Sequence, residues 1–166
     1  MLISVSELLK LDNSEQPLSV AVDLNNVSFS PLPIQFSEPV LVEGKLKNVG
    51  GVVMLDAVAN GTYKTNCDRC GKEIERSIQF DVKENFVKTP EGIENDPEAE
   101  LMEGQQFDIT ECLSKIAFAA FPSKHLCDLN CKGLCPDCGI DLNFDTCDCG
   151  KDEWDPRFEV LRGLFD

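Results

Sequence analysis

Apolar and polar positions alternate over much of the first half of the chain, as they do in strands with one buried face. The clearest stretch is residues 73–87, where one set of alternate positions is polar throughout. The other set is mostly apolar and is interrupted by Arg76 and Glu84; it contains Ile74, Ile78, Phe80, Val82 and Phe86. This pattern predicts one long strand in an antiparallel sheet with a solvated face.

Other segments of this half predict further strands. Residues 52–58 are apolar on both parities, which favours a central strand, and shorter alternating runs occur at 18–24 and from residue 40. Asn60-Gly61 predicts a hairpin turn, because a type I′ turn needs a positive φ at both central residues. We therefore expect an antiparallel sheet, or a partly closed β-barrel, over residues 18–88.

A helix is expected over residues 108–121. Asp108 can cap it, with Glu111 three residues later in the capping-box position, and Pro122 ends it. Its apolar residues recur at helical spacing and form a stripe wide enough to cover a sheet: Ile109, Leu113, Ile116, Ala117, Ala120 and Phe121. Together these elements predict an α+β fold, with the helix packed on the sheet.

Two segments outside this core differ in composition. Residues 90–106 contain six carboxylates, two prolines and two glycines but no Lys or Arg, which predicts an exposed, mobile loop. We expect a β-rich domain over residues 1–122 and a second unit over 123–166. That unit would contain a cysteine-rich zinc ribbon at 127–150 and a short terminal helix from Asp155, with Phe158, Leu161, Leu164 and Phe165 on its apolar face.

Composition and charge narrow the function classes. The chain has 166 residues, 42% of them hydrophobic, as in an ordinary globular protein. No apolar run has the length of a membrane span, and the first residues lack a basic signal-peptide region, so we expect a cytoplasmic protein. The formal net charge of −15 is opposite in sign to that of proteins that bind nucleic acid through phosphates.

Nine cysteines in a chain without an export signal indicate metal ligands before disulfides. Two segments share the form C-x-x-C-G, at residues 67–71 and 135–139, and Cys147-Asp-Cys149 follows the second. Two thiolates at this spacing reach one ion only through a tight turn, which the glycine permits. The pattern predicts zinc knuckles.

The number of cysteines suggests how the ligands divide between sites. Setting Cys112 aside as a small core residue leaves two Cys₄ sites, and therefore two zinc ions. One site would be local, with Cys135, Cys138, Cys147 and Cys149 as ligands. The other would join the sheet to the segment after the helix, through Cys67, Cys70, Cys127 and Cys131. The alternatives are a single metal ion, an iron–sulfur cluster on the same sulfurs, or His125 in place of Cys127, although a surface histidine is commoner.

Catalytic chemistry finds little support in the sequence. One histidine leaves few ways to build a Ser-His-Asp or Cys-His arrangement, and Gly50-Gly51 lacks the Lys-Ser/Thr of a phosphate-binding loop. A closed four-thiolate zinc site has no open position for water, so such sites are structural. We expect a protein that is not an enzyme.

Several of these strings together resemble the YceD family, bacterial and plastid proteins linked to accumulation of large-subunit ribosomal RNA. The resemblance runs from about residue 40 to the end and is carried by C-D-R-C-G, the A-A-F-P that ends the helix, C-K-G-L-C-P-D-C-G-I-D-L-N, C-D-C and D-P-R-F. It implies a non-enzymatic role in ribosome biogenesis, in the branch with a C-terminal zinc ribbon.

The charge adds an expectation about partners. A chain this acidic is expected to act through a basic protein, such as a ribosomal protein, at least as much as through large-subunit rRNA itself. The alternatives are a zinc-stapled protein-interaction module without a ribosomal role, and a thiol redox protein that uses Cys67 and Cys70.

Overall fold

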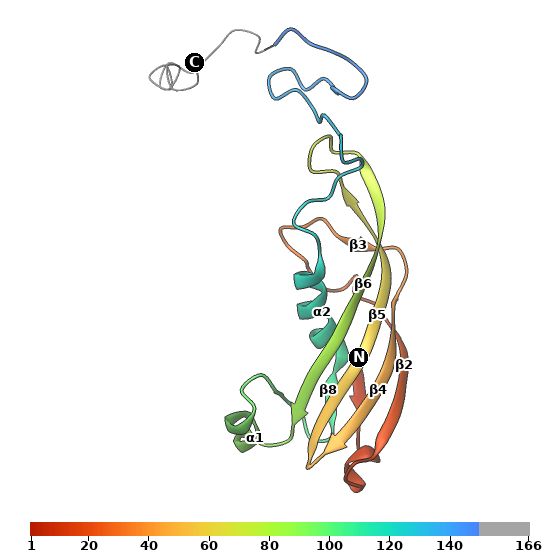
Figure 1. The fold of residues 1–166 in the computed structure, drawn as a ribbon, viewed down its shortest axis with the longest axis vertical. Coiled ribbons are helices and arrows are strands. Elements are labelled where there is room, and N and C mark those ends of the chain that lie inside the picture. The colour runs from red at the N-terminus through yellow and green to blue at the C-terminus, as the bar shows by residue number, and fades with distance from the viewer. Residues whose placement is uncertain (150–166) are drawn as a thin grey trace.

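The computed structural model describes residues 1–149 and is built around one long sheet (Figure 1). Its strands lie in the order β2-β4-β5-β6-β7, and β3 pairs with the outer part of β5. Neighbouring strands are antiparallel except β6 and β7, which are parallel. The bounds are β2 Glu15–Val22, β3 Gln35–Phe36, β4 Val40–Val49, β5 Val52–Asn66, β6 Glu73–Val87 and β7 Glu100–Leu101.

Five further elements complete the described part of the chain. The strands β1 (Leu2–Ser4) and β8 (Gln106–Asp108) form a separate antiparallel pair. The 3₁₀-helix η1 spans Leu8–Lys10, and the two α-helices are α1 (Pro90–Asn95) and α2 (Ile109–Ala120). Residues 1–149 include no helix that is both long and apolar enough to cross a membrane. The terminal helix predicted from Asp155 lies outside the described residues.

The core lies between one face of the sheet and α2. The apolar parity of β6 is buried, as the alternation predicted, and α2 packs against β6 (Figure 1). The side chain of Asp108 caps α2 by accepting a hydrogen bond from the Thr110 N–H at 2.8 Å. Cys112 lies in this core with 2% of its surface exposed, which confirms its prediction as a core residue.

The sheet is open within the described residues. The outer strand β2 pairs with β4 and the opposite outer strand β7 pairs with β6, so the two edges do not meet. Between the two predicted architectures, the structure therefore has the sheet with a covering helix. The alternative prediction of a partly closed barrel is wrong.

The predicted hairpin turn at Asn60-Gly61 is also wrong. β5 runs through both residues without a break, and the turn lies instead at Gly50-Gly51, where φ is 58° and 87°. Gly61 serves close packing: a Cβ built there would lie 3.1 Å from Val40 Cγ2. Because β5 and β6 continue past this point, they form a long hairpin whose tip carries the first C-x-x-C-G segment.

Most residues of 90–106 are exposed, as expected, but the segment is not an irregular loop throughout. This acidic segment contains α1 and β7, and Ala99 and Met102 are buried. Lys115 of α2 pairs with Glu100 at 2.6 Å, which ties the segment to the covering helix. Backbone pairing and two isolated apolar side chains hold it in place, and neither produces a periodic sequence pattern.

Candidate metal centres

The first C-x-x-C-G segment closes the long β5–β6 hairpin at one end of the sheet (Figure 1). β5 ends at Asn66, directly before Cys67, and β6 begins at Glu73. The Cys67 N–H donates to the Lys72 carbonyl and the Gly71 N–H donates to the Cys67 carbonyl, both at 2.8 Å. Gly71 has a φ of 71°, a conformation that favours glycine.

The second C-x-x-C-G segment repeats this turn bond for bond. The Cys135 N–H donates to the Ile140 carbonyl at 2.8 Å, and the Gly139 N–H donates to the Cys135 carbonyl at 2.9 Å. Gly139 has a φ of 74°. The two C-x-x-C-G segments thus adopt the same local structure, although one lies at the tip of a long hairpin and the other in a segment without long strands.

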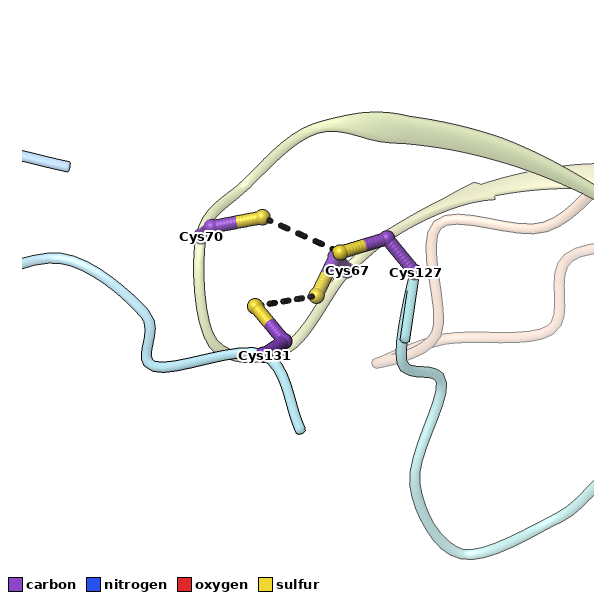
Figure 2. Close-up of side chains that lie close together, drawn as sticks. All are labelled: Cys67, Cys70, Cys127 and Cys131. Carbon is purple, nitrogen blue, oxygen red and sulfur yellow. Dashed lines mark hydrogen bonds between the residues drawn. The ribbon is translucent and has the colours of Figure 1, made fainter. Parts of the chain in front are cut away.

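The structure brings the predicted long-range ligands together. The sulfur atoms of Cys67, Cys70, Cys127 and Cys131 all lie within 4.8 Å of one another; we call this group site one (Figure 2). The Sγ atoms of Cys67 and Cys131 are 3.9 Å apart, and those of Cys70 and Cys127 are 3.6 Å apart.

Hydrogen bonds hold the segment after α2 against the hairpin tip. The Asp68 carboxylate accepts the His125 N–H at 2.6 Å, and the Asp68 N–H donates to the His125 carbonyl at 2.8 Å. The Arg76 guanidinium donates to the Leu126 carbonyl at 2.6 Å. Arg76, which interrupts the apolar parity of β6, therefore helps to position the residue before Cys127.

The predicted local ligands also come together. The sulfur atoms of Cys135, Cys138, Cys147 and Cys149 lie within 4.8 Å of one another; we call this group site two. Cys135 is buried, whereas Cys138 and Cys149 are exposed. Site two is thus closer to the surface than site one, where Cys67 and Cys131 are both buried.

The sulfur geometry fits a tetrahedral metal ion. Zinc–sulfur bonds of about 2.3 Å place neighbouring sulfurs of a tetrahedron about 3.8 Å apart, close to both distances at site one. A disulfide would need a separation of about 2.05 Å. Cysteines within residues 1–149 are all free, so the donor set of each site is four thiols.

The electrostatics of both sites favour a bound cation. Burial raises the pKa of Cys67, but backbone N–H groups of Cys127, Cys70 and Arg69 outweigh it and lower this pKa to about 6. The backbone N–H groups of Cys138 and Asp137 lower the pKa of Cys135 to about 7. Each site thus holds one thiol that ionises readily.

The neighbouring thiols resist a second ionisation. The hydrogen bond to Cys131, together with burial, raises the pKa of Cys127 to about 12. Four thiolates at these distances repel one another unless a cation lies between them. A divalent ion supplies that charge, and a closed four-thiolate site then has a structural rather than a catalytic chemistry.

His125 departs from the prediction of a surface histidine. It is 3% exposed, and its Nε2 lies 3.1 Å from the Tyr63 hydroxyl. The two rings meet edge to face, with centroids 5.7 Å apart. His125 is not among the clustered ligands. Its contacts with Tyr63 and Asp68 instead anchor the segment that carries Cys127 to the sheet. A lone histidine carries no spacing signal from which this role could be read.

Comparison with known proteins places the chain in a family. The family model described as "Large ribosomal RNA subunit accumulation protein YceD" matches residues 55–165. The chain belongs to the YceD family. The match begins within β5 and includes both C-x-x-C-G segments together with the remaining predicted ligands, so the resemblance inferred from the sequence is confirmed.

A curated relative carries the same family name. "Large ribosomal RNA subunit accumulation protein YCED homolog 1, chloroplastic" from Arabidopsis thaliana is 26% identical over 165 residues, covering 80% of this chain and 48% of the relative. This YceD chain therefore spans about half the length of that relative. No solved structure is significantly similar to this chain.

Proposed function

We propose that this protein is a non-enzymatic factor that supports the accumulation of large-subunit ribosomal RNA. The observation that carries the proposal is the YceD family match over residues 55–165, which contains both cysteine sites. The name of the Arabidopsis relative supports the same role. The boundary between the proposed units at 122 and 123 lies between the two halves of site one, so a metal there would staple the units together.

Each site would hold one zinc ion as a structural element. In site one the thiolates of Cys67 and Cys70 come from the hairpin tip, and those of Cys127 and Cys131 come from the segment after α2. Zinc there would fix the segment that leads into the ribbon. In site two zinc would organise a segment in which Phe144 is 84% exposed and the adjoining Leu134 is 43% exposed, so that it buries little apolar surface of its own.

The absence of an enzymatic role is part of the proposal. Four-thiolate zinc offers no coordination position to a substrate. The single histidine is buried and hydrogen-bonded to Tyr63, which leaves it without access to a substrate. Both features favour a binding factor over a catalyst or a thiol redox protein.

The proposed partner is a basic protein, such as a ribosomal protein, with rRNA contact as a secondary route. The formal charge is −15 before metal is counted, and two loaded four-thiolate sites would each add two negative charges. Such a protein attracts basic surfaces and is repelled by phosphates. We expect the cytoplasm as its compartment, whereas the Arabidopsis relative is named as chloroplastic.

A tagged protein recovered from growing cells, with its bound proteins and RNA both identified, tests the proposal. We expect large-subunit precursors and a ribosomal protein. The double variant Cys67→Ser/Cys70→Ser should lose them and lower the ratio of large- to small-subunit rRNA, whereas Cys112→Ala, which alters a cysteine outside both sites, should retain them. Association only with non-ribosomal proteins, and an unchanged rRNA ratio in cells lacking the protein, would favour the plain protein-interaction module instead.

A further inference from the structure

A short connection joins the two cysteine sites. Three residues separate Cys131 of site one from Cys135 of site two, and this connection lies against the first knuckle. The Leu134 N–H donates to the Arg69 carbonyl at 3.0 Å, and the Arg69 guanidinium donates to the Cys131 carbonyl at 2.6 Å. The two sites are therefore in direct structural contact.

The connection fits against the knuckle closely. Gly133 has a φ of 81°, and a Cβ built there would lie 2.9 Å from the Arg69 carbonyl oxygen. Both the backbone conformation and the space thus favour glycine at this position. Gly133 also accepts the Leu142 N–H at 2.9 Å, which links the connection to the loop between Cys138 and Cys147.

Asn143, in that loop of site two, contacts a ligand of site one. Its side-chain amide donates to Cys131 Sγ at 3.4 Å, and its Oδ1 accepts the Lys132 N–H at 2.8 Å. Asp141 fixes the amide by accepting from both the backbone N–H and the side-chain Nδ2 of Asn143, at 2.9 and 2.6 Å. A donor held in this way partly offsets the negative charge of a metal-bound thiolate and fixes its direction.

We propose that Asn143 is a positioning residue that couples the two metal sites, so that metal bound at site two strengthens metal binding at site one. The loop that carries Asn143 is closed by the ligands of site two, Cys135, Cys138, Cys147 and Cys149. Metal there holds the Asn143 amide against Cys131. Linkage makes the effect reciprocal, so metal at site one also strengthens binding at site two. The inference rests on the metal sites of the proposed function.

The first arm of the test measures the Zn²⁺ affinity of site one in reduced, metal-free protein, by competition with a chromophoric chelator. Asn143→Ala should weaken it by about 10- to 100-fold, the usual loss when a hydrogen bond to a metal ligand is removed. Asn143→Asp keeps the acceptor for the Lys132 N–H but places a carboxylate against the sulfur, so it should weaken binding at least as much. Phe144→Ala, at the exposed neighbouring side chain, should leave the affinity unchanged.

The second arm disables site two with Cys135→Ser/Cys138→Ser. Site one should then bind Zn²⁺ more weakly, and adding Asn143→Ala should cause little further loss, because the amide is no longer held against Cys131. In ¹¹³Cd-loaded protein, Asn143→Ala should shift the resonance of site one, since the metal senses the lost N–H···S bond. Strand signal in circular dichroism checks that each variant retains the sheet.

The outcomes separate the two proposals. If the unaltered protein binds no metal at either site, the zinc sites are wrong and the coupling is wrong with them. If both sites load but Asn143→Ala leaves the affinity and the ¹¹³Cd resonance of site one unchanged, the coupling alone is overturned. Equal losses from Asn143→Ala with site two intact and disabled would also overturn it, because the amide would then act without help from site two.

Discussion

One hydrogen bond between two buried side chains links the sheet to the ligand-bearing segment. Tyr63 faces the core from β5, and its hydroxyl lies 3.1 Å from His125 Nε2, two residues before Cys127. A polar group buried without a partner costs more than the hydrogen bond itself contributes. This pair is therefore expected to matter more to stability than the exposed ion pairs of the molecule.

Replacing Tyr63 with Phe tests the pair. The ring is kept, but His125 loses its partner, so Tyr63→Phe should lower the free energy of unfolding by about 1–3 kcal/mol. Urea denaturation of the metal-loaded protein measures the change. Ser77→Ala, which removes an exposed hydroxyl from the adjacent strand, is the control and should be nearly neutral. Equal effects of the two substitutions would contradict the role given to His125.

Cys112 should differ in reactivity from the other cysteines. Burial and the nearby carboxylates of Glu84 and Glu100 raise its pKa to about 12, so its thiolate is scarce at neutral pH. Cys127 has a similarly raised pKa, so the expected difference comes from packing: Cys112 lies in the apolar core of the sheet and α2, whereas the other eight cysteines lie in segments that we expect metal removal to loosen. When native, metal-free protein is alkylated at pH 8 and followed by mass spectrometry, eight cysteines should react before Cys112. Its modification together with the others would show that the helix does not cover it.

At the scale of elements, the strand β6, the helix α2 and both knuckles could be predicted because their signals are local. Alternating apolar residues, a capped amphipathic stripe and C-x-x-C-G each fix a short piece of backbone. The turn at Gly50-Gly51 was not predicted because Gly-Gly and Asn-Gly are both hairpin-turn signals, and the sequence alone does not show which of the two pairs forms the turn. β7 was not predicted because its two residues are defined by parallel pairing with β6, and α1 was not predicted because it spans only six residues with no apolar stripe.

The ligand division at the two sites could also be anticipated, because eight thiols fall into a compact local set and a remainder. The supporting residues could not. The contacts of Arg69 and Arg76 depend on how the hairpin tip meets a segment 50 or more positions away. The contact of Asn143 with Cys131 spans 12 positions and depends on how the loop of site two folds back on site one. Nothing in their immediate sequence distinguishes them from surface residues.

The acidic segment supplies a prediction at this scale. Met102 is 4% exposed, whereas its neighbour Leu101 is 49% exposed. Met102→Ala should therefore lower the free energy of unfolding by about 2–3 kcal/mol through lost burial and a cavity. Leu101→Ala should change it by less than about 0.5 kcal/mol. Denaturant unfolding of both variants measures the difference, and two small effects would restore the exposed-loop interpretation.

At the scale of the whole molecule, the sheet and the cysteine sites depend on different sources of stability. The sheet and α2 share a continuous apolar core, whereas site two has few buried apolar side chains around it. Metal–thiolate bonds contribute folding free energy directly where a core is missing. Site one should depend on both the apolar core and the metal, because half of its ligands belong to the β5–β6 hairpin.

Chelation should therefore act unevenly. Removing metal should release residues 127–149 to rapid backbone hydrogen exchange, while amides in β4, β5 and β6 keep their protection. Hydrogen exchange followed by mass spectrometry, with and without chelator, resolves the two regions. A uniform rise in exchange across both would show that the sheet depends on the metal as well.

The zinc content of the intact protein tests the central claim most directly. Native mass spectrometry of protein purified without oxygen should find two zinc ions per chain. Cys135→Ser should remove about one and Cys67→Ser the other, because each belongs to a different group of four. One ion in the unaltered protein would mean that half of the predicted ligands are not ligands. None, with the cysteines joined as disulfides, would contradict the account.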